Sequence, residues 1–572
     1  MWLTSDPDTP VQEDDWDFFE TVTSMESLQM RTGDELMDID QLASTKPYRL
    51  SFARTLVQRM TTERWVIEPK ILKVDVDGIG TAIYDIAANG HQITFVAFSD
   101  DVPEERRTGR LSEQRFDGMG FLCHGEVTTK RLKAERESLM LRSRGRTDWE
   151  TLGWTLATRS KRSFMGLVDL LASGGQPEQH TVASSGGYLF RNNGYYGNGR
   201  HGTRMWQSLP DDHPLSHPYH PEMFALYLWR QFGFDLAEEM ARIRSPEAAQ
   251  LQPDYKRTIG IGNSTGQGIS TFLTKWPGWM HAWIGLREEA IVRASNALAN
   301  KADIERAREL LRRAISYLAL RDGREDSYSC PDSELISNLT DIEAKLDALV
   351  SVGGSWSPIV NWARSHCHLE AADVLHSILT ETYSDLVDDL DEEFATRMNR
   401  VADVNPCQTV AELRELVSER YDWTKEWHIF PNFFYRSEEH GEQRVGIREF
   451  DDGENVETFT ALCRDVANLR SDLAYFGDNK SVGLFLLSHP NHRFLVERIQ
   501  TFGDDDYAEI RANLVDDSWI PAKAGRFVLS NFGMELSTAH NHRYVQGIFF
   551  QGAPLPEDLK VGREIDWIYP SV

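Results

Sequence analysis

The chain has 572 residues, of which 41% are hydrophobic and 10% aromatic, so it can bury large cores and is not globally disordered. Its formal charge of −28 argues against a general nucleic-acid binder, because such a protein needs a basic face toward phosphates. The N-terminus lacks the pattern of a signal peptide, and no apolar run approaches the roughly 20 residues that cross a bilayer. The five cysteines are odd in number and far apart, which is typical of reduced thiols. We therefore expect a soluble cytoplasmic protein without a membrane segment.

Residues 1–45 form a strongly acidic segment. They contain twelve acidic residues and a single basic one, Arg31. Such a segment repels itself, so we expect a solvated, poorly ordered arm. Its aromatic residues Trp16, Phe18 and Phe19 could dock on a partner or on the body of the chain.

Residues 46–173 are predicted to begin with a helix and an antiparallel three-stranded meander. From residue 51 apolar side chains recur every four residues, which indicates a helix. The dipeptides Asp77-Gly78 and Asn89-Gly90 favour tight hairpin turns, because both tolerate positive φ. They separate three segments rich in β-branched and aromatic residues, at 65–76, 79–87 and 92–99.

The rest of the chain is predicted to be mostly helical. An amphipathic helix is expected within 149–171. Residues 174–420 are interpreted as a central, mostly helical region with glycine-rich loops, and residues 421–572 as a C-terminal α+β region. In the latter, the strand-like segments 428–436 and 443–450 could pair. The predicted fold class is therefore α+β and helix-dominated, with antiparallel sheet near both ends, and a doubly wound dinucleotide-binding fold is not expected.

Two long runs without acidic residues distinguish the centre of this acidic chain. They cover residues 179–210 and 255–287 and contain two glycine-rich loops, at 184–202 and 260–268. Glycines permit the positive φ values that turn successive N–H groups into one concavity, and they let a ligand approach the backbone. Because local charge sets the field in a cleft, we interpret the loops as two walls of one anion-binding site.

The second loop is expected between a short strand at 258–261 and a helix at 269–275. A ligand there would meet the unpaired N–H groups of a helix N-terminus, which favour an anion. The alternative is a glycine-rich turn made for close packing, because the spacing matches neither the phosphate loop nor the dinucleotide fingerprint. The predicted ligand-binding residues of this run are Lys256, Arg257, Gly262, Asn263, Thr265, Gly266 and Gly268.

The first loop carries residue types suited to ligand binding and proton transfer. Arginine can bind a carboxylate or phosphate through two parallel hydrogen bonds. His201 titrates near neutral pH and is the first candidate for proton transfer, with Tyr196 the second. The alternative is a surface loop whose asparagines and glycines only satisfy turns. The predicted ligand-binding residues are Arg191, Asn192, Asn198, Gly199, Arg200 and Arg204.

A competing hypothesis is a serine hydrolase. Residues 262–266 match the pattern G-x-S-x-G with Ser264 at its centre, as in a nucleophile elbow between a strand and a helix. Asp388 and His489 follow in the required chain order. The preceding meander argues against this hypothesis, because that elbow lies on a parallel sheet.

His213, His217 and His220 form the densest cluster of metal-ligand residue types, within residues 211–222. Each of these histidines directly precedes a proline, so no single helix face presents all three. We therefore favour a proline-punctuated surface loop over a metal site.

The leading hypothesis is a cytoplasmic small-molecule enzyme that binds a carboxylate- or phosphate-bearing ligand at the two loops and uses acid–base chemistry. The alternatives are the Ser264 hydrolase and a non-enzymatic interaction protein that uses the acidic arm. The expected partner is an anionic small molecule, with no nucleic acid and no membrane, and a homo-oligomer is compatible with the sequence. The pattern of residues identifies neither a cofactor nor the reaction.

Overall fold

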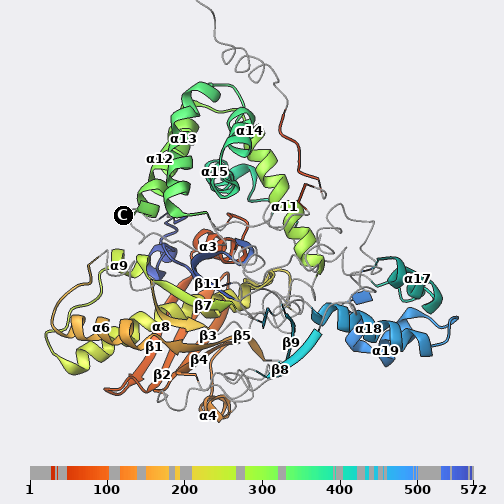
Figure 1. Ribbon diagram of the computed structural model, residues 1–572. Helices are drawn as coiled ribbons and strands as arrows, with labels where there is room; N and C mark the ends of the chain where they lie inside the picture. The colour runs from red at the N-terminus through yellow and green to blue at the C-terminus, as the bar shows by residue number, and fades with distance from the viewer. Residues whose placement is uncertain are drawn as a thin grey trace, which may run out of the picture.

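The computed structural model shows a mixed α+β protein built on one large sheet (Figure 1). The helices and strands below belong to the described part of the chain. That part comprises residues 27–32, 35–36, 48–101, 116–137, 150–178, 187–192, 209–265, 277–319, 330–390, 393, 404–420, 432–436, 443–448, 455–456, 460–493, 495–496, 499, 530–541, 544–563 and 567–569.

The sheet has nine strands in the order β1-β2-β3-β4-β5-β6-β7-β12-β11. All neighbours are antiparallel except β6 and β7, which are parallel. The chain therefore adds its two last strands beside β7 and not at the N-terminal edge. The strands are β1 (Val66–Val74), β2 (Gly80–Ala88), β3 (His91–Ser99), β4 (Gly118–His124), β5 (Thr151–Arg159), β6 (Tyr188–Asn192), β7 (Gly260–Thr265), β11 (Met534–Asn541) and β12 (Tyr544–Phe549).

The N-terminal strands confirm the predicted antiparallel order, although they do not form a separate meander. Asn89 and Gly90 both have positive φ, at 45° and 77°, and join β2 to β3 as their dipeptide predicts. Gly78, at a φ of 75°, lies in the turn between β1 and β2. Beyond β3 the sheet continues into β4 and β5, so β1–β3 are one end of the nine-stranded sheet.

Alternating residues of the sheet face two cores. On one face lies α8 (His220–Arg244), whose Trp229 packs edge-on against Phe190 of β6 at 5.5 Å between ring centroids. The opposite face carries a smaller apolar cluster, over which α4 (Thr129–Glu137) places the guanidinium of Arg131, 5.9 Å from the ring centroid of Phe121. Helices α3 (Phe52–Thr62), α6 (Lys161–Ala172), α9 (Pro253–Thr258) and α23 (Pro556–Lys560) complete this part.

A layer of five helices lies beyond α3 (Figure 1). Its central helix is buried along almost its whole length, because the other helices surround it. Two contacts join the helical layer to the sheet and to α3. The Tyr317 hydroxyl donates a hydrogen bond to Glu535 of β11 at 3.2 Å, and Arg54 of α3 forms an ion pair with Glu381. The five helices are α11 (Pro277–Asn296), α12 (Lys301–Ala319), α13 (Asp332–Leu349), α14 (Ser357–His366) and α15 (Leu369–Thr382), and the short η4 (Ser384–Leu386) follows.

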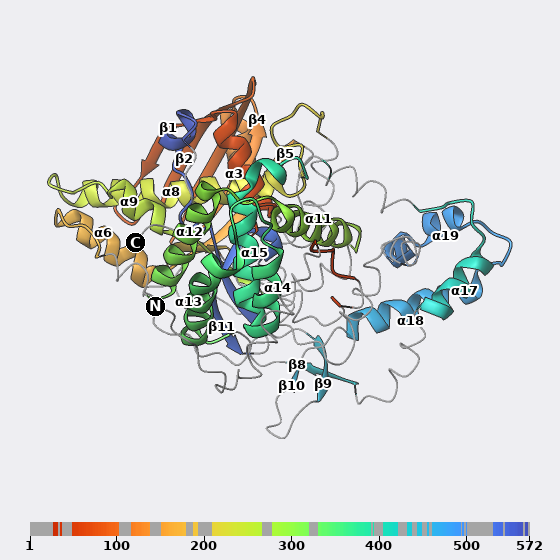
Figure 2. The ribbon, with the colours of Figure 1, turned by 90° about the horizontal axis from the view of Figure 1, so that it is seen from above.

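A third group of elements lies on the side opposite α6 in both views (Figures 1 and 2). The predicted pairing of 428–436 with 443–450 is confirmed as the antiparallel strands β8 and β9. The elements are β8 (Asn432–Arg436), β9 (Gln443–Arg448), β10 (Asn455–Val456), α17 (Val410–Arg420), α18 (Thr460–Tyr475), α19 (Val482–Ser488) and η6 (Pro490–His492). No helix in the described ranges is both long and apolar enough to cross a bilayer.

Part of the predicted acidic arm is packed against the helical layer. Leu28 is buried, and its backbone N–H donates to Asn296 at 2.8 Å. Arg31, the single base of residues 1–45, forms a bidentate ion pair with the buried Glu288 of α11. Leu28 and Arg31 therefore anchor residues 27–32 to the helical layer. Residues 1–26, 33–34 and 37–45 lie outside the described part, so the solvated arm stays a prediction there.

Candidate functional site

The candidate site lies at the carboxyl ends of β6 and β7. These strands run parallel with Asn192 opposite Asn263, so the chain leaves both strands at the same edge of the sheet. The two glycine-rich runs singled out from the sequence, residues 184–202 and 260–268, include these strands and continue along the chain beyond Asn192 and Thr265. Helix α8 connects the two strands, and ligands commonly bind at the carboxyl ends of strands joined in this way.

Two buried asparagines mark this edge. Asn192 and Asn263 are neighbours on one face of the sheet, the face that Phe190 shares with α8. The Asn192 amide donates to the Thr155 hydroxyl at 2.7 Å, and the Asn263 amide donates to the Met534 sulfur at 3.3 Å. The Asn263 carbonyl oxygen is buried and has no hydrogen-bond partner within the described residues. An acceptor of this kind costs free energy unless a ligand or water binds it.

The N-terminus of α8 covers the same edge. Because β5 runs antiparallel to β6 with Ala157 opposite Asn192, Gly153 lies past the carboxyl end of β6. A Cβ atom on Gly153 would lie 2.4 Å from the carbonyl oxygen of Pro221, in the first turn of α8. The helix therefore begins directly over this end of the sheet, and glycine is needed for the close approach.

Glu222 points from this first turn toward the sheet. It precedes Trp229 by seven residues, two helical turns, so the two side chains share the face of α8 that packs on the strands. Glu222 is 1% exposed, and within the described residues neither carboxyl oxygen bonds another residue. Burial raises the pKa of Glu222 to about 8, against the opposing effect of its own backbone N–H. The carboxyl group is therefore mostly protonated at neutral pH.

A segment close to the C-terminus closes the site from a third side. Phe532 packs against Tyr219, the residue before α8, at 4.9 Å between ring centroids, and Met534 contacts Asn263. Directly before Phe532, Asn531 is completely buried, and neither its amide nitrogen nor its side-chain carbonyl oxygen has a partner in the described ranges. The edge thus combines amide groups and a neutral carboxyl, which can bind a polar ligand and transfer a proton.

The cations predicted at the second loop lie elsewhere. Lys256 and Arg257 belong to α9, which precedes β7, whereas Thr265 ends β7 at the opposite end, about 20 Å away for a strand of this length. Lys256 pairs with Glu238 at 2.8 Å, and Arg257 pairs with the buried Asp558 at 3.0 Å. Carboxylates of the protein already neutralise both side chains, so we do not retain them as ligand-binding residues.

The glycines and asparagines of the second loop fall partly within a strand. The predicted strand at 258–261 is displaced, because β7 covers Gly260–Thr265 and includes Gly262, Asn263 and Thr265. A Cβ atom on Gly262 would lie 2.8 Å from the Tyr188 ring, so the packing alternative explains this glycine. Arg191 lies on the opposite face of β6 from Asn192.

The remaining predicted residues fall outside the described part of the chain, and their roles stay predictions. They are Tyr196, Asn198, Gly199, Arg200, His201, Arg204, Gly266 and Gly268.

The serine-hydrolase hypothesis gains no support from the described residues. Ser264 lies within β7, opposite Gln546 of β12, whereas a nucleophile elbow places its serine on the turn after the strand. Asp388 accepts a hydrogen bond from Arg49 at 2.6 Å, and His489 lies 3.5 Å from Asp472 in the third group of elements. We do not propose this function.

The histidines of residues 211–222 do not converge on one point. His213 packs against His124 of β4 at 5.0 Å between ring centroids, and burial with the neighbouring His124 and His91 lowers its pKa to about 4. His217 packs against His220, whose Nε2 lies 3.0 Å from the Thr55 hydroxyl. Within the described part, these three do not form a group with metal-binding geometry.

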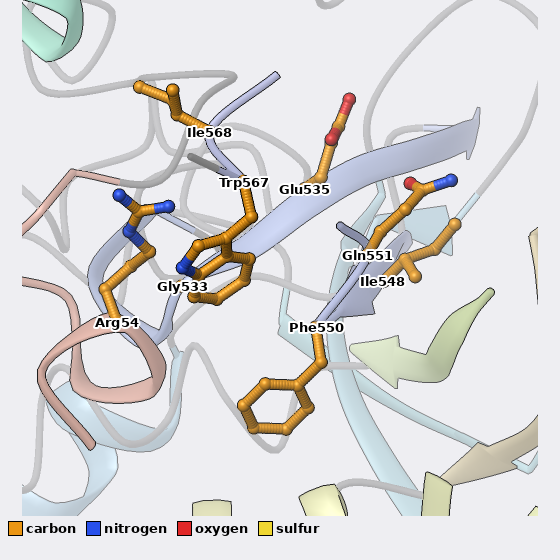
Figure 3. A pocket seen from close by; sticks show the side chains of 8 residues that line it. All are labelled: Arg54, Gly533, Glu535, Ile548, Phe550, Gln551, Trp567 and Ile568. Atoms are coloured by element: carbon orange, nitrogen blue, oxygen red, sulfur yellow. The ribbon is translucent and has the colours of Figure 1, made fainter. Parts of the chain in front are cut away.

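A small cavity lies between the sheet and the helical layer (Figure 3). Its volume of about 20 Å³ holds roughly one water molecule. Arg54 stacks over Trp567 at 4.5 Å from the ring centroid, and Tyr317 bonds Glu535 on its wall. The cavity is too small for a substrate and belongs to the interlayer packing. Its lining residues are Arg54, Gly533, Glu535, Ile548, Phe550, Gln551, Trp567 and Ile568.

No protein-family model matches the chain, and neither a curated protein nor a solved structure matches it.

Glu222 and Asn531 are the site residues that sequence analysis did not assign to the glycine loops. Glu222 is the last residue of the histidine-rich segment 211–222, which the sequence pattern indicated only as a cluster of metal-ligand residue types. Its signal was its position directly after a proline that begins a long apolar helix. Asn531 has no comparable signal, because only the tertiary contacts of Phe532 and Met534 bring this segment beside Tyr219 and β7.

Proposed function

We propose that this protein is a small-molecule enzyme whose polar, anionic ligand binds at the carboxyl ends of β6 and β7. The observation that carries the proposal is the pairing of Asn192 with Asn263 on adjacent parallel strands. Both glycine-rich runs, residues 184–202 and 260–268, continue along the chain from these strand ends. A ligand here would also supply partners for the buried polar groups of Asn263 and Glu222.

The residues of the loop after β6 take the roles expected from their chemistry. Arg200 and Arg204 would bind the carboxylate or phosphate, since an arginine fork matches either group. The buried amides would orient the rest of the ligand. Local charge supports an anion, because the loop lies in a run of the chain without acidic residues.

Glu222 and His201 are the proposed proton-transfer groups. A carboxyl group whose pKa is about 8 can donate a hydrogen bond to an anionic oxygen and exchange its proton near neutral pH. An ionised glutamate at the same place would repel the ligand, so the protonated state of Glu222 is compatible with an anion. Strongly perturbed acids of this kind are concentrated at functional sites.

The test is a thermal-shift screen of the full chain against carboxylates, phosphorylated metabolites and nucleotides. We expect one ligand class to raise the melting temperature of the wild type and to fail with Arg200→Ala or Arg204→Ala. The matched control is Lys256→Ala, which removes a cation that pairs with Glu238 at the far end of β7. This control should keep the ligand-induced shift.

A ligand that stabilises the wild type and all three alanine variants equally would bind elsewhere, and this result would contradict the proposal. Once a ligand is identified, Glu222→Gln should bind it and fail to convert it. Normal turnover by this variant would remove Glu222 from the chemistry.

A further inference from the structure

Three side chains with metal-ligating atoms converge in the third group of elements. Asp472 lies on α18, His489 follows α19, and His492 ends η6. Asp472 Oδ2 lies 2.7 Å from His492 Nε2 and 3.5 Å from His489 Nδ1. The three ligand atoms all lie within 4.8 Å of one another, the sole such group in the described part of the chain.

The spacing suits a transition-metal ion. Zinc binds imidazole nitrogen and carboxylate oxygen at about 2.1 Å, so the ligand atoms of a tetrahedral site lie about 3.4 Å apart. The two distances to Asp472 lie on either side of this value, and rotations of exposed side chains could adjust them. Two histidines with one carboxylate also leave coordination positions open for water.

Aromatic packing holds both imidazoles in place. Phe485 stacks on His492 with 4° between the ring planes, and on His489 with 28°. Phe476 packs against Phe485 from another side, at 5.3 Å between ring centroids. His492 is only 2% exposed, whereas His489 is half-buried. The site is thus rigid on its inner side and reachable by an ion from solvent.

A simple hydrogen-bonded group is the competing explanation. The carboxylate of Asp472 can accept a hydrogen bond from His492 at 2.7 Å without any metal. The 3.5 Å separation from His489 is long for a hydrogen bond, so this second imidazole gains little from such an arrangement. A shared metal ion accounts for the convergence of all three groups.

We infer that Asp472, His489 and His492 bind one divalent transition-metal ion of the zinc type. The ion joins α18 to the turn after α19 and stabilises this helical unit. This inference is independent of the proposed function, because the site lies on different elements and its test measures metal uptake, not turnover.

The experiment is titration of the chelator-treated full chain with zinc by calorimetry, and with cobalt followed by its visible absorption. We expect one equivalent of zinc and a rise in melting temperature, as binding to the folded state alone requires. His489→Ala and Asp472→Ala should each weaken binding at least tenfold and abolish the cobalt band. His489 is partly exposed, so its variant should fold, which circular dichroism verifies.

The matched control is His366→Ala, since His366 is an exposed histidine on α14 whose Nδ1 lies 2.9 Å from its own helix carbonyl at Trp362. It should bind zinc like the wild type. Absence of a zinc equivalent in the wild type, or equal binding by His489→Ala and the control, would overturn the inference and leave an ordinary hydrogen-bonded group.

Discussion

Replacing Glu222 by glutamine should make the protein more stable at alkaline pH. The folded chain buries this carboxyl without a bond to another described residue, so it binds the proton more tightly than the unfolded chain does. Stability therefore falls as the pH rises above the ordinary pKa of 4.5, and the loss is complete above about 8. At about 1.4 kcal/mol for each pH unit, the full loss is on the order of 5 kcal/mol.

Glutamine has nearly the same shape and carries no charge at any pH. The variant and the wild type should have similar free energies of unfolding at pH 4, where both side chains are neutral. The variant should gain an increasing advantage of up to about 5 kcal/mol as the pH rises from 5 to 8. Urea denaturation followed by tryptophan fluorescence at several pH values measures this difference.

Glu239→Gln is the control on the same helix, because that carboxylate pairs with Arg242 near the surface. The free energy of unfolding of this variant should not rise relative to that of the wild type as the pH increases from 5 to 8. Parallel stability curves for Glu222→Gln and the wild type would refute the reasoning, since they would mean that Glu222 is ionised and stabilised in the folded protein. Loss of turnover together with increased stability would be the expected pattern for a residue kept for function.

Two further substitutions test the packing of named residues. Arg31→Ala should lower the free energy of unfolding by about 3 kcal/mol at pH 7, because it removes the bidentate partner of the buried Glu288. Burial acts to raise the pKa of Glu288, but Arg31 and Arg287 lower it to about 2. The loss of stability measured by urea denaturation should therefore shrink as the pH falls from 4.5 toward 2. A loss independent of pH would contradict the ion-pair explanation. Gly262→Ala should lower stability by about 1–3 kcal/mol, since its Cβ would lie 2.8 Å from the Tyr188 ring. Thermal denaturation should show partial recovery when Tyr188→Val is added, and no recovery would locate the strain elsewhere.

Local turn chemistry predicted the N-terminal strands, while the wider sheet needed tertiary information. Asn89-Gly90 determines its hairpin by backbone preference alone, so β2 and β3 follow from sequence. The helix expected within 149–171 is α6, whereas the strand before it, β5, was not identified from the sequence. Every residue of β5 is buried, so it shows no polar alternation, and the helical spacing belongs to α6 alone.

The anion-binding site stays a prediction, whereas the structure shows which of its residues belong to strands and helices. The absence of acids and the glycines identified both loops, yet β7 begins later than expected because Pro253 starts a short helix first. Gly262 and Asn263 are typical of a loop, and pairing with β6 and β12 makes them strand residues. Asn531 comes from the far end of the chain, and no local pattern could have assigned it.

The position of β11 and β12 has a consequence for how the protein is made. These strands come after residue 530, yet they complete the sheet beside β7, which ends at Thr265. During synthesis β7 is therefore an unprotected sheet edge until residues 534–549 have left the ribosome. Truncation before Met534 should leave this edge free to pair with other chains, so aggregation of nascent or shortened forms would begin at β7.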